Sequence, residues 1–369
     1  MINQKRSSYN NGIDIVRFIG FLCVFVHHFV YRGGNSIYSR SDAYWQNSFF
    51  DSISYFGAEG VTIFFCLSGF LLSKLLLKEH ADTGKISVKS FYKRRILRIW
   101  PLYFGYIGFC LLLSPLFGSQ SIQVNEIPAL LTFTYNWEQL FSGESRGMAA
   151  ILWSISVEEQ IYFFLPLLIV LFLKAKSNLL ASSLIFLGIT SRFLLYNSDQ
   201  NLYRNTLSYM STIGIGMLFA IYEPKLKAWI NSKSVMLRLF FLGLVTAYIL
   251  MFKTFFSVGP LSVMAFDLTA LITVILLVIC DEKGAAVLTR RRKLFGFLGR
   301  RTFGMYIFHW PILALLVSRK FLYSDLLGVS PLGLMLALAL TILVSVISYR
   351  YFEKPFLEMR RKYQYVRVG

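Results

Sequence analysis

An acid, a guanidinium group and an imidazole occur together in one apolar stretch near the start of the chain: Asp14, Arg17 and His28, within residues 13–31. Ionisable residues are rare inside membrane-spanning helices and usually mark a functional path. In a helix, Arg17 and His28 are about 16 Å apart along the axis and only about 20° apart around it. We therefore expect both to line one buried passage, each near a different membrane face.

His28 is the first candidate for acid–base chemistry. A neutral imidazole can take a proton from a hydroxyl group and return it to a leaving group. The neighbouring His27 points about 100° away, so at most one of the two shares the face of Arg17. A hydrogen bond between helices is the alternative role for both histidines.

A second polar stripe lies in ILWSISVEEQIYFFLP, where Ser154, Glu158 and Tyr162 recur every four residues. Such spacing places side chains on one side of a helix. If this span starts at the outer surface, Glu158 lies about 12 Å below it, in the same half of the membrane as His28. The carboxylate could then orient the imidazole and raise its basicity. A structural hydrogen bond is the alternative.

Basic residues open another span, FYKRRILRIWPLYF, with Arg94, Arg95 and Arg98. Guanidinium groups bind phosphate oxygens in pairs, so this cluster suits a polyphosphate ligand from the cytoplasm. Contact with anionic lipid headgroups explains it equally well. In RRTFGMYIFHWPIL, Tyr306 and His309 lie deeper, where His309 could contact a bound cofactor or simply pack against its neighbours.

These residues must be positioned by a membrane protein, because 56% of the chain is hydrophobic and only 15% is charged. Each apolar run is close to the ~20 residues that a bilayer requires. The sequence predicts an all-α, polytopic bundle of about ten transmembrane helices, forming one domain over residues 1–369 without a soluble domain. The predicted spans lie near residues 13–31, 57–77, 99–117, 151–173, 179–197, 207–222, 237–255, 262–280, 302–318 and 331–350.

The distribution of charge predicts the orientation. Most of the 38 Lys and Arg residues fall at the N-terminus, in the loops that follow spans two, four, six and eight, and in the C-terminal tail. Cytoplasmic loops retain positive charge, so both termini are expected in the cytoplasm. The basic balance is thus a topology signal, and no nucleic-acid-binding module is evident. The four cysteines fall inside spans without metal-ligand spacing, so packing roles are expected and no metal site.

Five stretches together resemble the acyltransferase 3 family of integral membrane acyltransferases, which includes bacterial O-antigen, exopolysaccharide and nodulation-factor O-acetyltransferases. In chain order they are GIDIVRFIGFLCVFVHHF, GVTIFFCLSGFLL, FYKRRILRIWPLYF, LWSISVEEQIYFFLPLL and TFGMYIFHWPIL. The first contains an Arg, ten intervening residues and a His. The resemblance covers nearly the whole chain.

The resemblance implies a multi-pass enzyme of the bacterial inner membrane that moves an acetyl group from cytoplasmic acetyl-CoA to a hydroxyl group outside it. The acceptor would be a cell-surface glycan or a lipid-linked oligosaccharide, with membrane lipids around the bundle. The family's functional positions fall on residues of this sequence as follows: catalytic His28, Glu158, Arg17 and Asp14, and donor-binding Arg94, Arg95 and Arg98. Tyr306 and His309 complete the expected donor site.

Two departures from the family pattern affect these expectations. Thr62 stands where many relatives have an acid after Gly-Val, so a role for that acid is in doubt. A C-terminal hydrolase-like domain, which some members carry, is not evident, so we expect the membrane domain to handle the acceptor. Buried charges also mark translocation routes, so a transporter or flippase for an anionic or glycan-lipid substrate is the alternative function. A non-catalytic glycan-binding protein is a third.

Overall fold

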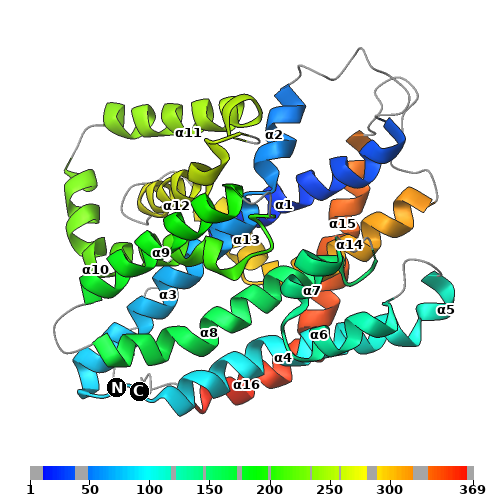
Figure 1. Ribbon diagram of the computed structural model, residues 1–369, viewed down its shortest axis with the longest axis horizontal. Helices are drawn as coiled ribbons and strands as arrows, with labels where there is room; N and C mark the ends of the chain where they lie inside the picture. Colours follow the sequence, from blue (N-terminus) through cyan, green and yellow to red (C-terminus); the bar gives the residue numbers. More distant parts are fainter. Residues whose placement is uncertain are drawn as a thin grey trace.

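The computed structural model describes residues 11–37, 49–117, 122–143, 147–172, 177–197, 201–232, 235–256, 259–280, 289–318 and 331–363. Within these ranges the chain is a bundle of helices and has no strand, which confirms the all-α prediction (Figure 1). The α-helices are α1 (Asn11–Ile37), α2 (Phe49–Gly57), α3 (Gly60–Thr83), α4 (Val88–Leu112), α5 (Ser114–Phe117), α6 (Ile127–Leu131), α7 (Tyr135–Ser142), α8 (Trp153–Phe172), α9 (Ser177–Asn197), α10 (Met210–Asn231), α11 (Val235–Phe255), α12 (Ser262–Ile279), α13 (Thr289–Gly299), α14 (Thr302–Ser318), α15 (Pro331–Ser348) and α16 (Lys354–Arg361).

Eight helical segments of the described chain are long and apolar enough to cross a membrane, which confirms the polytopic bundle. They are Gly12–Val30, Ser52–Thr83, Val88–Leu112, Ala150–Phe172, Ser177–Tyr196, Val235–Phe255, Ser262–Ile279 and Leu332–Arg361. Two further predicted spans fold as helices but are not both long and apolar enough to be counted with these eight. Helix α10 carries three charged residues towards its end, and the apolar part of α14 is shorter. The count of ten spans therefore stays a prediction.

Helix α10 nevertheless lies against the membrane-spanning helix α3. At the start of α10 the ring of Tyr209 packs on Phe65 of α3, with 4.3 Å between centroids, and further along Glu223 pairs with Lys74 at 2.6 Å. Both contacts advance in the same direction, so α10 runs parallel to α3.

The expected cytoplasmic position of the termini stays a prediction.

Close packing around α3 depends on glycines. A Cβ atom on Gly60 would lie 2.4 Å from the carbonyl oxygen of Gly20 in α1. A Cβ atom on Gly69 would lie 2.5 Å from the carbonyl oxygen of Ile213 in α10. Small residues allow helix backbones to approach closely in lipid. Helix α3 is therefore the centre against which α1 and α10 are fixed.

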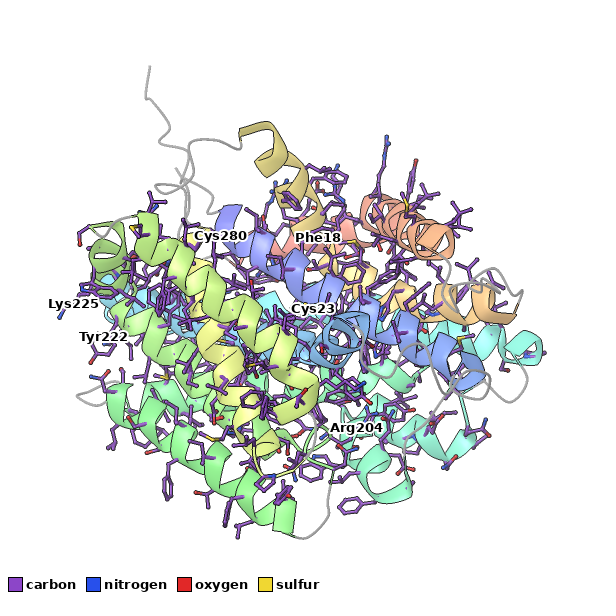
Figure 2. All side chains as sticks on the ribbon, turned by 90° about the horizontal axis from the view of Figure 1, so that it is seen from above. Phe18, Cys23, Arg204, Tyr222, Lys225 and Cys280 are labelled. Atoms are coloured by element: carbon purple, nitrogen blue, oxygen red, sulfur yellow. The ribbon has the colours of Figure 1, made fainter. Side chains whose placement is uncertain are left out.

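None of the four cysteines, which all lie in the described part of the chain, forms a disulfide. Cys66 and Cys110 are buried, while Cys23 and Cys280 are partly buried and lie well apart (Figure 2). This confirms the expectation of packing roles.

Candidate functional site

A cavity of about 480 Å³ lies among α1, α3, α4, α8, α14 and α16. Its wall is mostly apolar, with several polar groups at its border. The polar and charged lining side chains are Arg17, Ser68, Arg95, Arg98, Ser154, Glu158, Tyr162, Thr302, Tyr306 and Arg360. Ligand sites are typically apolar cavities of about 300–1,000 Å³ with a few convergent polar groups. The cavity therefore has the size and character of a binding site.

Four arginines give the cavity its charge, against the single carboxylate of Glu158. Arg17, Arg95 and Arg98 were predicted as site residues, and the structure brings them together although they come from two different helices. The guanidinium group of Arg95 lies over the ring of Tyr162, 4.9 Å from its centroid. The fourth is Arg360, which the sequence analysis missed. In the sequence, the basic residues of the C-terminal tail indicate only topology.

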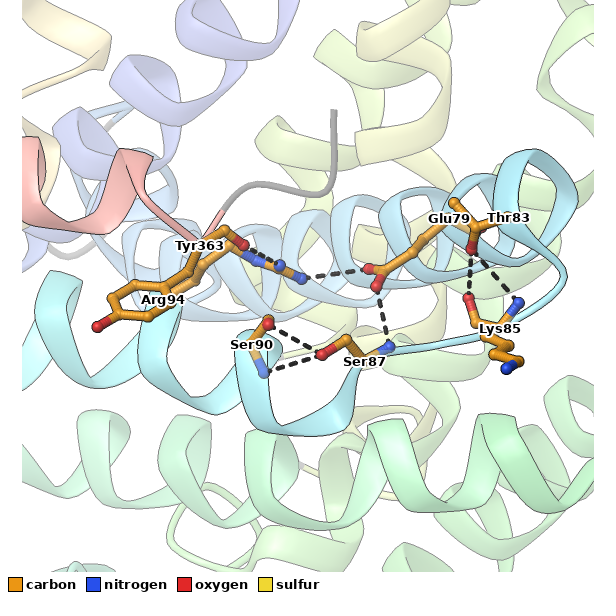
Figure 3. Close-up of polar contacts among 7 residues, drawn as sticks. All are labelled: Glu79, Thr83, Lys85, Ser87, Ser90, Arg94 and Tyr363. Atoms are coloured by element: carbon orange, nitrogen blue, oxygen red, sulfur yellow. Dashed lines mark hydrogen bonds and ion pairs between the residues drawn. The ribbon is translucent and has the colours of Figure 1, made fainter. Parts of the chain in front are cut away.

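Arg94 does not take part in this cavity, contrary to the donor-binding role predicted for it. It is buried, and its guanidinium group donates to the carbonyl oxygen of Tyr363 at 2.7 Å and pairs with Glu79 at 3.4 Å. Glu79 also accepts from the backbone N–H of Ser87, the N-cap of α4 (Figure 3). Arg94 thus fastens the C-terminal tail to the α3–α4 turn. Successive residues on a helix point about 100° apart, which is why Arg94 and Arg95 face different surroundings.

The polar stripe of α8 is confirmed, because Ser154, Glu158 and Tyr162 all line the cavity. Glu158 accepts hydrogen bonds from the hydroxyl groups of Tyr162 and of Ser68 in α3, the latter at 3.0 Å. The expected partnership of Glu158 with His28 is not among the hydrogen bonds of the described residues. The carboxylate is held by hydroxyl groups next to the arginines.

Asp14 positions Arg17 and does not line the cavity. Its side chain is fully buried, and its two oxygens lie 3.3 Å from Nη1 of Arg17 and 3.5 Å from Nη1 of Arg300. A Cβ atom on Gly299 would lie 2.1 Å from the carbonyl oxygen of Asp14, so glycine allows α13 to approach α1 here. The acid therefore ties the start of α1 to the α13–α14 junction and orients Arg17.

His28 is separated from the cavity, and this corrects the prediction that it shares one passage with Arg17. Its Nδ1 lies 2.8 Å from Nε2 of His309 in α14. Neither histidine lines the cavity, so the donor contact predicted for His309 is not supported. Tyr306 joins the two regions: its phenol lines the cavity and hydrogen-bonds to Ser154 at 2.6 Å, while its backbone carbonyl contacts Nδ1 of His309.

The two neighbouring histidines of α1 have different surroundings, as their spacing predicted. Nδ1 of His27 donates to the carbonyl oxygen of Ser54 in α2 at 2.9 Å, whereas His28 faces α14. His27 thus makes the hydrogen bond between helices that was the alternative for both. The edge of Trp310 packs against the His28 ring at 4.9 Å between centroids, and Trp310 also donates to the carbonyl oxygen of Gly147.

A second polar cluster, missed in the sequence, joins α9, α10 and α12. Arg192 is fully buried and donates to Asp267, to Ser211 and to two backbone carbonyl oxygens. Nearby, Tyr203 donates to the buried carboxylate of Glu59. Burial and this carboxylate raise the pKa of Tyr203 well above its usual value, so the phenol stays protonated. The cluster contacts no cavity-lining arginine among these hydrogen bonds, and the charge of Arg192 is compensated within it by Asp267.

Residues 10–350 match the acyltransferase domain family, and the chain therefore belongs to that family. It is 27% identical over 376 residues to "Putative O-acetyltransferase SAS0844" of Staphylococcus aureus (strain MSSA476), covering 95% of this chain and 58% of that protein. It is 28% identical over 324 residues to "O-acetyltransferase OatA" of S. aureus (strain NCTC 8325 / PS 47), covering 81% of this chain and 52% of that protein. The chain spans little more than half the length of these relatives. No solved structure matches it.

Proposed function

We propose that this protein is a membrane O-acetyltransferase that moves an acetyl group from acetyl-CoA to a hydroxyl group of a cell-surface glycan or lipid-linked oligosaccharide. The observation that carries the proposal is a cavity lined by four arginines and by Tyr306, whose backbone carbonyl oxygen contacts His309 of the His28–His309 pair. Family membership and the names of the relatives support the same reaction class. The proposal places the protein in a bacterial inner membrane with both termini in the cytoplasm.

The arginines that line the cavity suit the donor. Guanidinium groups bind phosphate oxygens through paired, charge-assisted hydrogen bonds, and CoA carries several phosphate groups. Arg95 and Arg98 are one turn apart on α4, and Arg17 and Arg360 approach from α1 and α16. Among the described residues, the aromatic rings of Phe91 and Tyr162 are the close partners of the Arg95 guanidinium, so its donors are available to an anion.

The His28–His309 pair, which lies outside the cavity, suits the transfer step. His28 takes the proton of the acceptor hydroxyl while the hydroxyl oxygen bonds to the thioester carbonyl carbon. The carbon–sulfur bond then breaks, and His28 returns the proton to the departing thiolate. For this the acyl end of the donor must pass the Tyr306 phenol, which Ser154 holds in place. Direct transfer and a two-step route through an acyl-histidine both fit the arrangement.

The test compares adjacent histidines on the same helix. Purified protein in lipid nanodiscs is given radiolabelled acetyl-CoA and a glycan acceptor, and transfer is measured for the wild type, His28→Asn and His27→Asn. Asparagine can keep the His27 hydrogen bond to the Ser54 carbonyl, but at position 28 it cannot accept the proton. We expect H28N to lose about 10²–10⁴-fold in kcat and H27N to stay within a few-fold.

A different result would overturn the assignment. If the wild type transfers no label to any hydroxyl acceptor, yet moves a labelled glycan lipid or anion across vesicles, the protein is a transporter or flippase. If transfer occurs and H28N retains it, the function stands but His28 is not the base.

A further inference from the structure

We infer that His309 is a positioning residue that fixes the tautomer of His28, with the proton on Nδ1 and the basic lone pair on Nε2. The inference deepens the proposed function, on which its catalytic consequence rests. The sequence predicts a donor contact or simple packing for His309, and nothing in it links His309 to His28.

The backbone carbonyl of Tyr306 fixes the proton of His309. The oxygen of Tyr306 can only accept, so the contact with His309 requires a proton on Nδ1 of His309. In a neutral imidazole the other nitrogen, Nε2, then carries the lone pair. Nε2 of His309 lies 2.8 Å from Nδ1 of His28, so Nδ1 of His28 must be the donor. The lone pair of neutral His28 is therefore on Nε2.

The relative orientation of the rings supports this hydrogen bond. The planes of His28 and His309 differ by 12°, and their centroids are 5.1 Å apart. The two nitrogens are only 2.8 Å apart although the ring centroids are 5.1 Å apart, so both nitrogens lie close to the line that joins the centroids. The N–H···N contact therefore lies nearly in the plane of both rings. The donor hydrogen and the acceptor lone pair of an imidazole both lie in its plane, so this arrangement is favourable for a hydrogen bond.

Packing holds His309 in this position. Its side chain is fully buried and contacts Phe21 and Phe25 of α1, with ring centroids 6.0 and 6.2 Å away. The ring of Tyr306, from its own helix, lies 5.6 Å away between centroids. A fixed second group that orients the catalytic imidazole is the arrangement found in nucleophile–base–orienter triads. Here a backbone carbonyl and a neutral histidine would do what a carboxylate does there.

The arrangement has a consequence for the transfer step. When Nε2 of His28 accepts the hydroxyl proton, the imidazole becomes positively charged. The lone pair of His309 then accepts a stronger, charge-assisted hydrogen bond from Nδ1 of His28. His309 therefore stabilises the charge that forms during transfer and contributes little to holding the donor, since it does not line the cavity.

The experiment uses two replacements of similar size. In H309Q, the amide oxygen can accept from Nδ1 of His28; in H309M, the thioether is only a weak acceptor. We expect H309M to lower kcat about 10–100-fold with the KM for acetyl-CoA unchanged, and H309Q to recover most of that loss. Thermal unfolding of both variants shows whether the fold is intact. Equal losses in both variants, or no loss in H309M, would overturn the positioning role.

A spectroscopic readout is independent of activity. The chain has only four histidines, so ¹⁵N-histidine labelling gives a spectrum that single substitutions can assign. We expect neutral His28 to carry its proton on Nδ1 in the wild type and in H309Q, and to become a tautomer mixture in H309M. A proton on Nε2 in the wild type would overturn the inference. The expected tautomer in a protein without transfer activity would instead count against the proposed function alone.

Discussion

Arg192 and Arg95 both lie inside the helical bundle, but their surroundings differ. The difference distinguishes a charge that is paired within the protein from one that is available to a ligand. Arg192 is fully buried and donates to a carboxylate, a hydroxyl group and two carbonyl oxygens. Arg95 borders a cavity, and its close partners among the described residues are aromatic rings. A buried charge must be compensated. Around Arg192 the protein supplies the compensation, whereas around Arg95 it leaves room for an anionic ligand.

The largest effect is a loss of stability, and we expect it at Arg192, whose charge is compensated by groups of the protein itself. Arg192→Met leaves Asp267 without its guanidinium partner, and removing one member of a buried ion pair costs about 3–5 kcal/mol. We expect a large drop in the thermal unfolding temperature of the purified protein, whether or not acetyl-CoA is present.

The double variant R192M/D267L is the matched control, because removing both charges eliminates the uncompensated group. It should recover a substantial part of the lost stability. If the single and double variants are equally stable, the unpaired carboxylate of Asp267 is not the cause of the lost stability. The Arg192–Asp267 pair then does not compensate the buried charge of Arg192.

Helix periodicity correctly predicted which side chains share a face of one helix. It could not predict which residues from distant helices they contact. The faces of His27 and His28, and the stripe of Ser154, Glu158 and Tyr162, followed from the helical repeat, and the structure confirms them. The role of Arg94 could not be predicted in this way, since its partner Tyr363 lies in the C-terminal tail. The pairing of His28 with His309, a residue from the ninth predicted span, is equally remote in sequence.

The adjacent residues Arg94 and Arg95 allow a second comparison, with a smaller expected effect than at Arg192. We expect Arg95→Gln to raise the KM for acetyl-CoA about tenfold, equivalent to about 1.4 kcal/mol of binding, with a smaller change in kcat. Stability should change little, because Arg95 has no ion pair among the described residues. Steady-state transfer at varied donor concentration measures this, and added salt should narrow the difference from wild type.

Arg94→Gln is the control for Arg95→Gln, and it should behave in the opposite way. Loss of its contacts with Glu79 and Tyr363 should lower stability by about 1–3 kcal/mol, while the KM for acetyl-CoA stays near the wild-type value. A larger rise in KM for R94Q than for R95Q would show that the donor does not use the cavity face of α4.

The smallest effect is expected at Arg360, which α16 contributes to the cavity from the far end of the chain. Helix α16 packs beside α4, so Arg360 reaches the same site as Arg95 and Arg98 (Figure 1). It is only partly buried, and solvent weakens its interaction with an anion. We expect Arg360→Gln to raise the KM for acetyl-CoA about threefold, which corresponds to less than 1 kcal/mol.

Arg361 provides the control for this position, because it has the same side chain on the same helix but is exposed and does not line the cavity. Arg361→Gln removes the same charge from the tail and should leave the KM unchanged. If both variants raise the KM equally, the tail acts through its overall positive charge and not through a contact in the cavity. A selective effect of R360Q would instead place the C-terminal helix in the donor site, next to Arg95 and Arg98 from much earlier in the chain.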